Sequence, residues 1–401
     1  MHSPGTIAGP HVADPLPVHP GAHSTARLLV ACSRPNPDLE ALYGLLQGGV
    51  DWVGLLAQAE RHSITPLLYW CLSRMRAGVA PPQIFEQLLL SARGCTQQSL
   101  RHAATLHRIL AAFETRGIPL MSFKGPVSAW SLYANPGLRQ MCDLDLLVRP
   151  EDAVRAVDAL VELGCKVAGP APVSALWLYR YVNETHFDAP YGVNIDLHWQ
   201  LGPIHVERWF DVCEVWSRRT CVPVAGFLVP TLGREDHLRF LCMHAAKHGW
   251  FMLRDLSDLA RLIHLGVDCD AALTEAGRSG GVRTLLLGLG LIRDVLGEIL
   301  PAHLNRRIAA EPCVRKLLAS AKRTLLAESV PDESTAANLW RLWDLIERPG
   351  DRARLCLGRL QPNATDWEWC PLPAPLRGVY YLLKPFRLAV QYLVPPSCRR
   401  S

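Results

Sequence analysis

The hydrophobic periodicity of the chain changes twice, and this change limits the folds that the chain can adopt. Apolar residues recur every three or four positions over residues 26–116, form short and partly alternating runs over 117–232, and return to the helical period over 233–330. Helices and strands bury their apolar faces with these two different periods. The sequence therefore predicts an α+β fold, in which a small mixed sheet is flanked by N- and C-terminal helical regions.

The two ends of the chain differ from the rest in composition and in hydrophobic pattern. Residues 1–25 are rich in Pro, His and Gly and predict a disordered N-terminus, and residues 331–401 predict an irregular, partly helical tail. We find no secretory signal and no apolar stretch of about 18 residues, the length that a membrane span needs. The 13 cysteines lie at irregular spacings without a C-x-x-C pair. We therefore expect a cytoplasmic protein without a disulfide framework or a zinc ribbon.

Charge restricts the classes of partner. Lys plus Arg exceed Asp plus Glu by 42 − 37 = 5, and no basic stripe lies near the motifs described below, which argues against a long nucleic acid. The C-terminal segment around Pro385 combines aromatic residues with five basic ones and no acid. It predicts either a kinked helix packed on the domain, which we favour, or peripheral membrane contact with anionic lipid.

The chemically informative residues lie in the middle region. Asp143 and Asp145 are two positions apart in MCDLDLLV, a predicted strand, so both side chains point to one face. Two carboxylates on one strand face repel each other, and Mg²⁺ or alternatively Mn²⁺ suits such oxygen ligands. Asp196 lies in a similar apolar run, VNIDLHWQL. Three carboxylates on neighbouring strands predict a metal-dependent phosphoryl-transfer site, although solvated acids at a strand edge are the alternative.

A basic turn precedes these acids. IPLMSF predicts a strand that ends at Lys124 and Gly125, before a predicted helix. Gly125 allows the backbone to approach a phosphate closely, and Lys124 supplies a point charge. Arg139, four residues before Asp143, offers a planar clamp for an anion. The alternatives are a surface role for Lys124 and a structural role for Arg139 as the partner of Asp143 or Asp145.

A predicted helix further along carries His237, His244, Lys247 and His248. The His244/His248 pair has metal-ligand spacing, but there is no H-E-x-x-H and no evident third ligand, so we expect no zinc. Two interpretations remain for this helix face. Either Lys247 or His248 contacts a phosphate in the cleft, or the face makes an ordinary helix–helix contact.

The run F-K-G…L-Y…P-G-L-R-Q-M-C-D-L-D-L-L-V-R-P-E-D, followed by I-D-L-H-W, resembles the uncharacterised nucleotidyltransferase family of the polymerase-β-like superfamily. The resemblance is close over residues 117–200 and looser to about residue 265. It implies that Asp143 and Asp145 bind Mg²⁺, that Asp196 is a third ligand or a base, and that Gly125 holds the triphosphate turn. Lys-Gly stands where the superfamily usually has Gly-Ser, so the serine hydroxyl on the phosphate is missing.

The activity that the resemblance implies is transfer of a nucleoside monophosphate from an NTP, such as ATP, to an acceptor, with release of pyrophosphate. The sequence identifies neither the base of the NTP nor the acceptor. The alternative function is a catalytically inactive nucleotide-binding or scaffold module in a biosynthetic complex. The three acids favour the enzyme, and the substituted turn favours the module.

Overall fold

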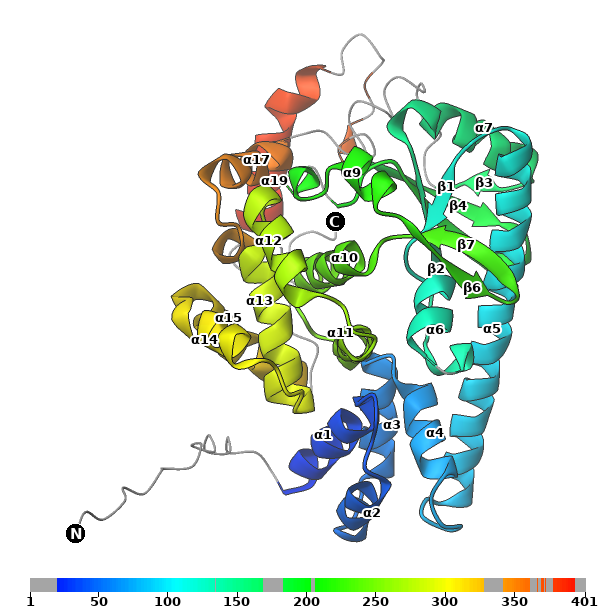
Figure 1. Cartoon of the computed structure of the whole chain (residues 1–401), viewed down its shortest axis with the longest axis vertical. Coiled ribbons are helices and arrows are strands. Elements are labelled where there is room, and N and C mark those ends of the chain that lie inside the picture. The colour runs from blue at the N-terminus through cyan, green and yellow to red at the C-terminus, as the bar shows by residue number, and fades with distance from the viewer. Residues whose placement is uncertain are drawn as a thin grey trace, which may run out of the picture.

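A computed structural model describes residues 20–133, 135–168, 183–202, 206–327, 342–360, 366, 369, 370, 372 and 378–393. It confirms the α+β class: a small mixed sheet lies between helical regions (Figure 1). Of the predicted disordered N-terminus, residues 1–19 lie outside the described residues, and a helix begins at Pro20. In the part of the chain described, no helix is both long enough and apolar enough to cross a membrane.

Five helices precede the sheet. They are α1 (Pro20–Ser33), α2 (Leu39–Gln47), α3 (Trp52–Arg61), α4 (Thr65–Ser73) and α5 (Pro82–Thr115). The carboxylates of Asp38 and Asp51 accept hydrogen bonds from the first free N–H groups of α2 and α3, which explains where these helices begin. Helix α5 is 34 residues long and runs from the N-terminal helices to the sheet (Figure 1).

The sheet has five strands in the order β1-β2-β5-β4-β3. The strands are β1 (Leu120–Ser122), β2 (Asp143–Val148), β3 (Lys166–Val167), β4 (Glu184–Ala189) and β5 (Val193–His198). Strands β2 and β5 are parallel, and the other pairs are antiparallel. Strands β4 and β5 form a hairpin, and Tyr191 and Gly192 in its turn have φ values of 67° and 70°.

The two faces of the sheet differ because side chains alternate along each strand. Leu144, Leu146 and Val148 of β2 join Ile195 and Leu197 of β5 in a core cluster with α5 and α7. The opposite face carries the acids near the start of β2. Further along that face, Leu147 belongs to a second cluster with Phe123, Phe210 and Phe240. One face is therefore wholly structural, and the other is polar at one end and closed by aromatic rings at the other.

Short helices connect the strands. They are α6 (Pro126–Leu132), η1 (Pro136–Leu138), η2 (Pro150–Asp152), α7 (Ala153–Glu162), η3 (Pro190–Gly192), η4 (Glu207–Trp209) and α9 (Val212–Ser217). A two-stranded sheet of β6 (Thr220–Val224) and β7 (Phe227–Thr231) follows, which the periodicity did not predict. Its turn, Ala225-Gly226, has positive φ at both residues. This dipeptide is the feature of the sequence that could have indicated a hairpin.

The remaining helices form the second helical region (Figure 1). They are α10 (Arg234–Lys247), α11 (Leu253–His264), α12 (Cys269–Ser279), α13 (Val282–Leu291), η5 (Ile292–Leu296), α14 (Ala302–Ala310), α15 (Pro312–Leu326), α17 (Pro349–Leu360) and α19 (Tyr380–Leu393). Pro385 lies inside α19, as predicted. Lys384 and Arg387 of this helix form ion pairs with buried Asp366, so both positive charges have a partner within the chain.

Candidate active site

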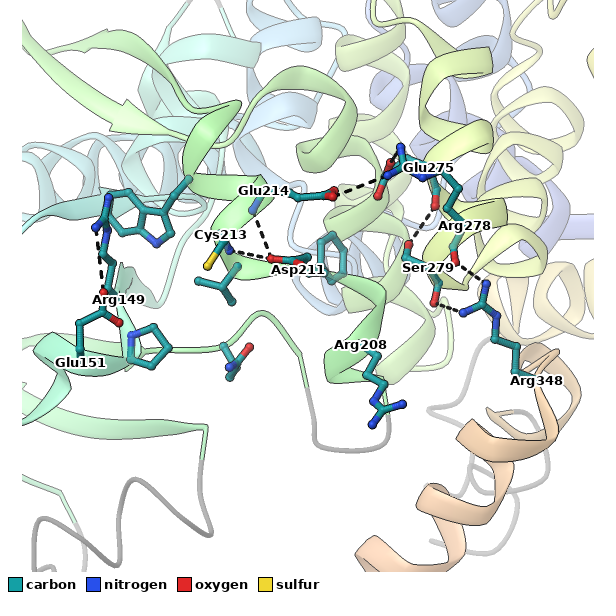
Figure 2. Close-up of a pocket in the computed structure, with 15 residues that line it drawn as sticks. Arg149, Glu151, Arg208, Asp211, Cys213, Glu214, Glu275, Arg278, Ser279 and Arg348 are labelled. Atoms are coloured by element: carbon teal, nitrogen blue, oxygen red, sulfur yellow. Dashed lines mark hydrogen bonds and ion pairs between the residues drawn. The ribbon is translucent and has the colours of Figure 1, made fainter.

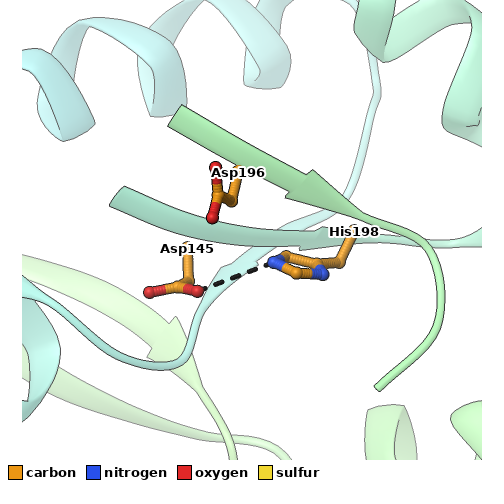
Figure 3. Close-up of side chains that lie close together, drawn as sticks. All are labelled: Asp145, Asp196 and His198. Carbon is orange, nitrogen blue, oxygen red and sulfur yellow. Dashed lines mark ion pairs between the residues drawn. The ribbon is translucent and has the colours of Figure 1, made fainter. Parts of the chain in front are cut away.

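Strand register brings the predicted acids together. In the parallel pair of β2 and β5, Asp145 lies opposite Asp196, and Asp143 lies opposite Asn194. The antiparallel pair of β5 and β4 then places His186 opposite Asp196. Figure 3 shows Asp145, Asp196 and His198 side by side on the two parallel strands. One ligand atom from each of these three residues lies within 4.8 Å of the other two.

Asp145 is the most buried of the three acids, and two cations face it. Lys124 Nζ lies 3.7 Å from Asp145 Oδ2, and His198 Nε2 lies 3.6 Å from Asp145 Oδ1. Burial alone would raise the pKa of Asp145, but Lys124 and then His198 lower it to about 2. Asp145 is therefore ionised at neutral pH, within a pocket of compensating charge.

His198 is held between two carboxylates. Its Nδ1 lies 3.0 Å from Glu184 Oε2, on the side away from Asp145. Burial lowers the pKa of His198, but the carboxylates of Asp145 and Glu184 on either side of the ring raise it to about 9. An imidazole must be neutral to coordinate a metal. His198 is therefore better described as a counter-ion of Asp145 than as a metal ligand.

Asp143 has the opposite electrostatic balance. Burial and the charge of Asp145 raise its pKa, and Lys124 opposes them only in part. Asp145 Oδ2 is buried and accepts no hydrogen bond from the described residues. Adjacent carboxylates, one of them with an orphaned oxygen, fit a hard divalent cation such as Mg²⁺ or Mn²⁺. Asp145 and Asp196 are the acids that would hold it, and Asp143, which lies on the same face of β2 but outside the cluster of three ligand atoms, would be the further ligand that the sequence predicts.

The predicted basic turn lies directly against the start of β2. Gly125 has φ 55° and ψ −119°, which only glycine adopts without strain. A Cβ at this position would lie 2.8 Å from the carbonyl oxygen of Asp143, so the close approach also requires glycine. This contact explains how Lys124, at the end of β1, reaches Asp145 on the neighbouring strand.

The C-terminal end of α10 lies on the same side of the site. Burial, followed by the charges of Lys124 and His248, lowers the pKa of His244 well below its ordinary value. The charge of Lys247 in turn helps to lower the pKa of Glu184. The structure thus brings Lys247 and His248 into the electrostatic environment of Lys124 and the acids. Among the described residues, His244 and His248 are not part of a three-ligand metal cluster.

Arg139 has a different partner from those that the sequence suggested. Its Nη2 lies 2.8 Å from Oδ2 of Asp258 on α11, and its Nε donates to the same carboxylate. The hydroxyl of Tyr133 also donates to Asp258, at 2.7 Å. All three side chains are buried. Arg139 is therefore saturated by Asp258, although its charge still lowers the pKa values of Asp143 and Asp145.

Sequence reasoning did not single out Glu184 or His186. His186 Nδ1 lies 2.7 Å from Asp196 Oδ1, and its side chain is 54% exposed, which places it at the rim of the site. The available signal was the alternation in ETHFDA, which puts Glu184, His186 and Asp188 on one face of β4.

A separate cavity of about 970 Å³ lies where β2 ends (Figure 2). Arg149, Arg208, Arg278 and Arg348 line it together with several carboxylates, and Arg278 forms ion pairs with Glu275 and Glu214. Aromatic rings separate it from the acids. Phe123 contacts His198 and Phe240, and Phe240 contacts Phe210 in the cavity wall. Among the described residues that line the cavity, none is Asp143, Asp145 or Asp196.

The three acids and the turn at Lys124 and Gly125 lie on one face of a small mixed sheet. This is the arrangement expected of a nucleotidyltransferase. Residues 48–297, more than half of the chain, match the model of a protein family described as "Uncharacterised nucleotidyltransferase". The chain belongs to this family.

Two further comparisons were made. No curated protein matches the chain. Among solved structures, the chain is similar to an antigenic nucleotidyltransferase-like protein from Paracoccidioides brasiliensis, with 14% identity and a TM-score of 0.30. The match covers 55% of this chain and 92% of that one. At this TM-score the similarity adds nothing to the family assignment.

Proposed function

We propose that the protein transfers a nucleoside monophosphate from an NTP to an acceptor hydroxyl or similar group, with release of pyrophosphate and with Mg²⁺ or Mn²⁺ as cofactor. The observation that carries the proposal is the pair of buried Asp145 and half-buried Asp196 on adjacent parallel strands, with Asp143 on the same face of β2 and one oxygen of Asp145 unpartnered. When bound by these acids, the cation would supply charge neutralisation for the phosphates.

Residues of the chain would bind the phosphates and take up the proton of the acceptor. Lys124, Lys247 and His248 would bind the phosphates, and the Gly125 turn would let the triphosphate approach the start of β2. Asp196, with the exposed His186 hydrogen-bonded to it, would take the proton from the acceptor as the acceptor oxygen attacks the α-phosphorus. The bond to the pyrophosphate then breaks. Arg139 would act on this site through its charge and its hold on Asp258, not by contact with substrate.

The test is pyrophosphate release with each of the four NTPs, Mg²⁺ and a panel of small-molecule, sugar and peptide acceptors. Asp145→Asn and Asp196→Asn should abolish release. Asp158→Asn, at an exposed position on α7, is the matched control and should behave like the wild type. Release that is unaffected by Asp145→Asn would exclude this site as its source.

One observation favours a second candidate, an inactive nucleotide-binding module. Lys124 and His198 already neutralise Asp145 within the chain, so the fold does not depend on a metal to hold this acid. Such a module would bind an NTP without releasing pyrophosphate under any acceptor condition. Equilibrium nucleotide binding measured beside the release assay distinguishes the two functions.

A further inference from the structure

Lys124 occupies an unusual position for a phosphate-binding lysine, because it faces a carboxylate. The side chains of Lys124 and Asp145 are only 10% and 6% exposed, so solvent screens their attraction poorly. Lys124 Nζ lies 3.7 Å from an oxygen of Asp145, which belongs to the three side chains whose ligand atoms lie within 4.8 Å of one another. The ammonium therefore lies where an added cation would also have to lie.

The attachment of Lys124 is loose compared with that of the other counter-ion. Its Nζ is 3.7 Å from Asp145 Oδ2, too far for a hydrogen bond, and it forms no other ion pair or hydrogen bond with the described residues. His198, in contrast, is anchored on its far side by Glu184 at 3.0 Å. The backbone at Gly125 is fixed against Asp143, but the four-carbon stem of Lys124 can swing.

We propose that Lys124 is a resident counter-ion, which neutralises Asp145 in the free protein and moves to the phosphates of the nucleotide when metal and nucleotide bind together. This inference rests on the proposed function. A divalent cation that binds alone must approach the acids against the repulsion of the ammonium. A nucleotide supplies negative charges that draw the ammonium away, so each ligand strengthens the binding of the other.

The experiment measures binding rather than turnover. Calorimetric titrations give the affinity for Mn²⁺ alone and for a non-hydrolysable NTP with and without Mn²⁺. The proteins are the wild type, Lys124→Met and a matched control, Lys166→Met, which removes the same charge from an exposed position on β3. Lys124→Gln is the second variant, with the same expected signs, should the methionine variant fail to fold.

Removal of the ammonium should have opposite effects on the two ligands. We expect Lys124→Met to bind Mn²⁺ alone at least tenfold more tightly than the wild type, and the nucleotide with Mn²⁺ at least tenfold more weakly. The gain in nucleotide affinity produced by Mn²⁺ should shrink in this variant and remain unchanged in Lys166→Met. An unchanged or weakened Mn²⁺ affinity in the Lys124 variants would overturn the inference.

Asp145→Asn separates this inference from the proposed function. If Asp145→Asn abolishes Mn²⁺ binding while the Lys124 variants bind Mn²⁺ like the wild type, the metal site is supported and the role of Lys124 as a resident counter-ion is wrong. If the wild type binds neither Mn²⁺ nor any nucleotide, both fail.

Discussion

Asp143 and Asp145 are two residues apart on β2, yet their surroundings differ. Asp145 faces two cations. Asp143 does not, and burial and the negative charge of Asp145 raise its pKa. In metal-free protein, Asp143→Asn should therefore raise stability by about 1 kcal/mol, because it removes a repulsion. Asp145→Asn should lower stability by about 3 kcal/mol, because it leaves Lys124 and His198 uncompensated.

Thermal melts with and without Mg²⁺ check this pair of predictions. Both variants should lose transfer activity, and neither should gain the stabilisation by Mg²⁺ that we expect for the wild type. Equal shifts of melting temperature in the two variants would contradict the different environments of the two acids.

A substitution at Gly125 gives a second prediction about stability. Gly125→Ala places a methyl group 2.8 Å from the Asp143 carbonyl oxygen at a backbone conformation that disfavours alanine. We expect a loss of about 2 kcal/mol in stability and a displaced Lys124. Gly94→Ala in α5 is the control: its Cβ meets nothing within 4 Å, so the variant should be about 0.5–1 kcal/mol more stable. Urea unfolding measures both.

The sequence predicted residues whose signal is local and missed partners that are distant in the chain. Asp143, Asp145 and Asp196 stand out because each interrupts an apolar strand. Asp258 lies 119 positions from Arg139, so nothing in the local pattern links them. The sequence left Arg139 between a substrate clamp and a partner of Asp143 or Asp145, and only the packing of α11 provides its actual partner.

At the scale of elements, the Arg139–Asp258 pair fastens the segment before β2 to α11. Both side chains are at most 2% exposed, so loss of one charge leaves the other buried and unpaired. Asp258→Asn should therefore destabilise the protein by about 3–5 kcal/mol. The double variant Arg139→Met, Asp258→Asn should recover part of this loss. A double-mutant cycle by chemical denaturation measures the coupling, and additive losses would show that the two residues act independently.

The β6–β7 hairpin shows why some elements escaped prediction. Its strands contain Pro223 and Pro230, residues that ordinarily argue against a strand. The pair is a separate two-stranded sheet, so both strands are edges and tolerate proline. In the main sheet, in contrast, β1 and β2 are buried apolar runs and β4 and β5 alternate, so these strands were visible in the sequence.

At the scale of the whole molecule, two buried histidines make stability depend on pH. Burial, and for His62 also the charge of Arg61, lowers the pKa values of His62 and His237 to about 4. The unfolded chain titrates near 6.5 and binds more protons between these values. The contribution of these two histidines to stability should thus be complete above pH 6.5 and fall as the pH drops towards 4, by about 1.4 kcal/mol per pH unit for each histidine.

His62→Asn isolates one of these contributions, since asparagine retains an acceptor for the Leu253 N–H. Between pH 7 and pH 5, the wild type should lose about 2 kcal/mol more stability than the variant. Urea unfolding at the two pH values measures the difference. A variant with the same pH dependence as the wild type would show that His62 is not neutral in the folded protein.

Helix α5 has a mechanical consequence for access to the site. At 34 residues it is about 51 Å long, and its buried side chains join two cores: Leu88 packs with the N-terminal helices, and Leu106 and Phe113 pack under the sheet. A hinge between these two parts would have to break a continuous rod. If the function proposed above is right, the acceptor would reach the acids across the rim at Asp196 and His186, where the site already meets water.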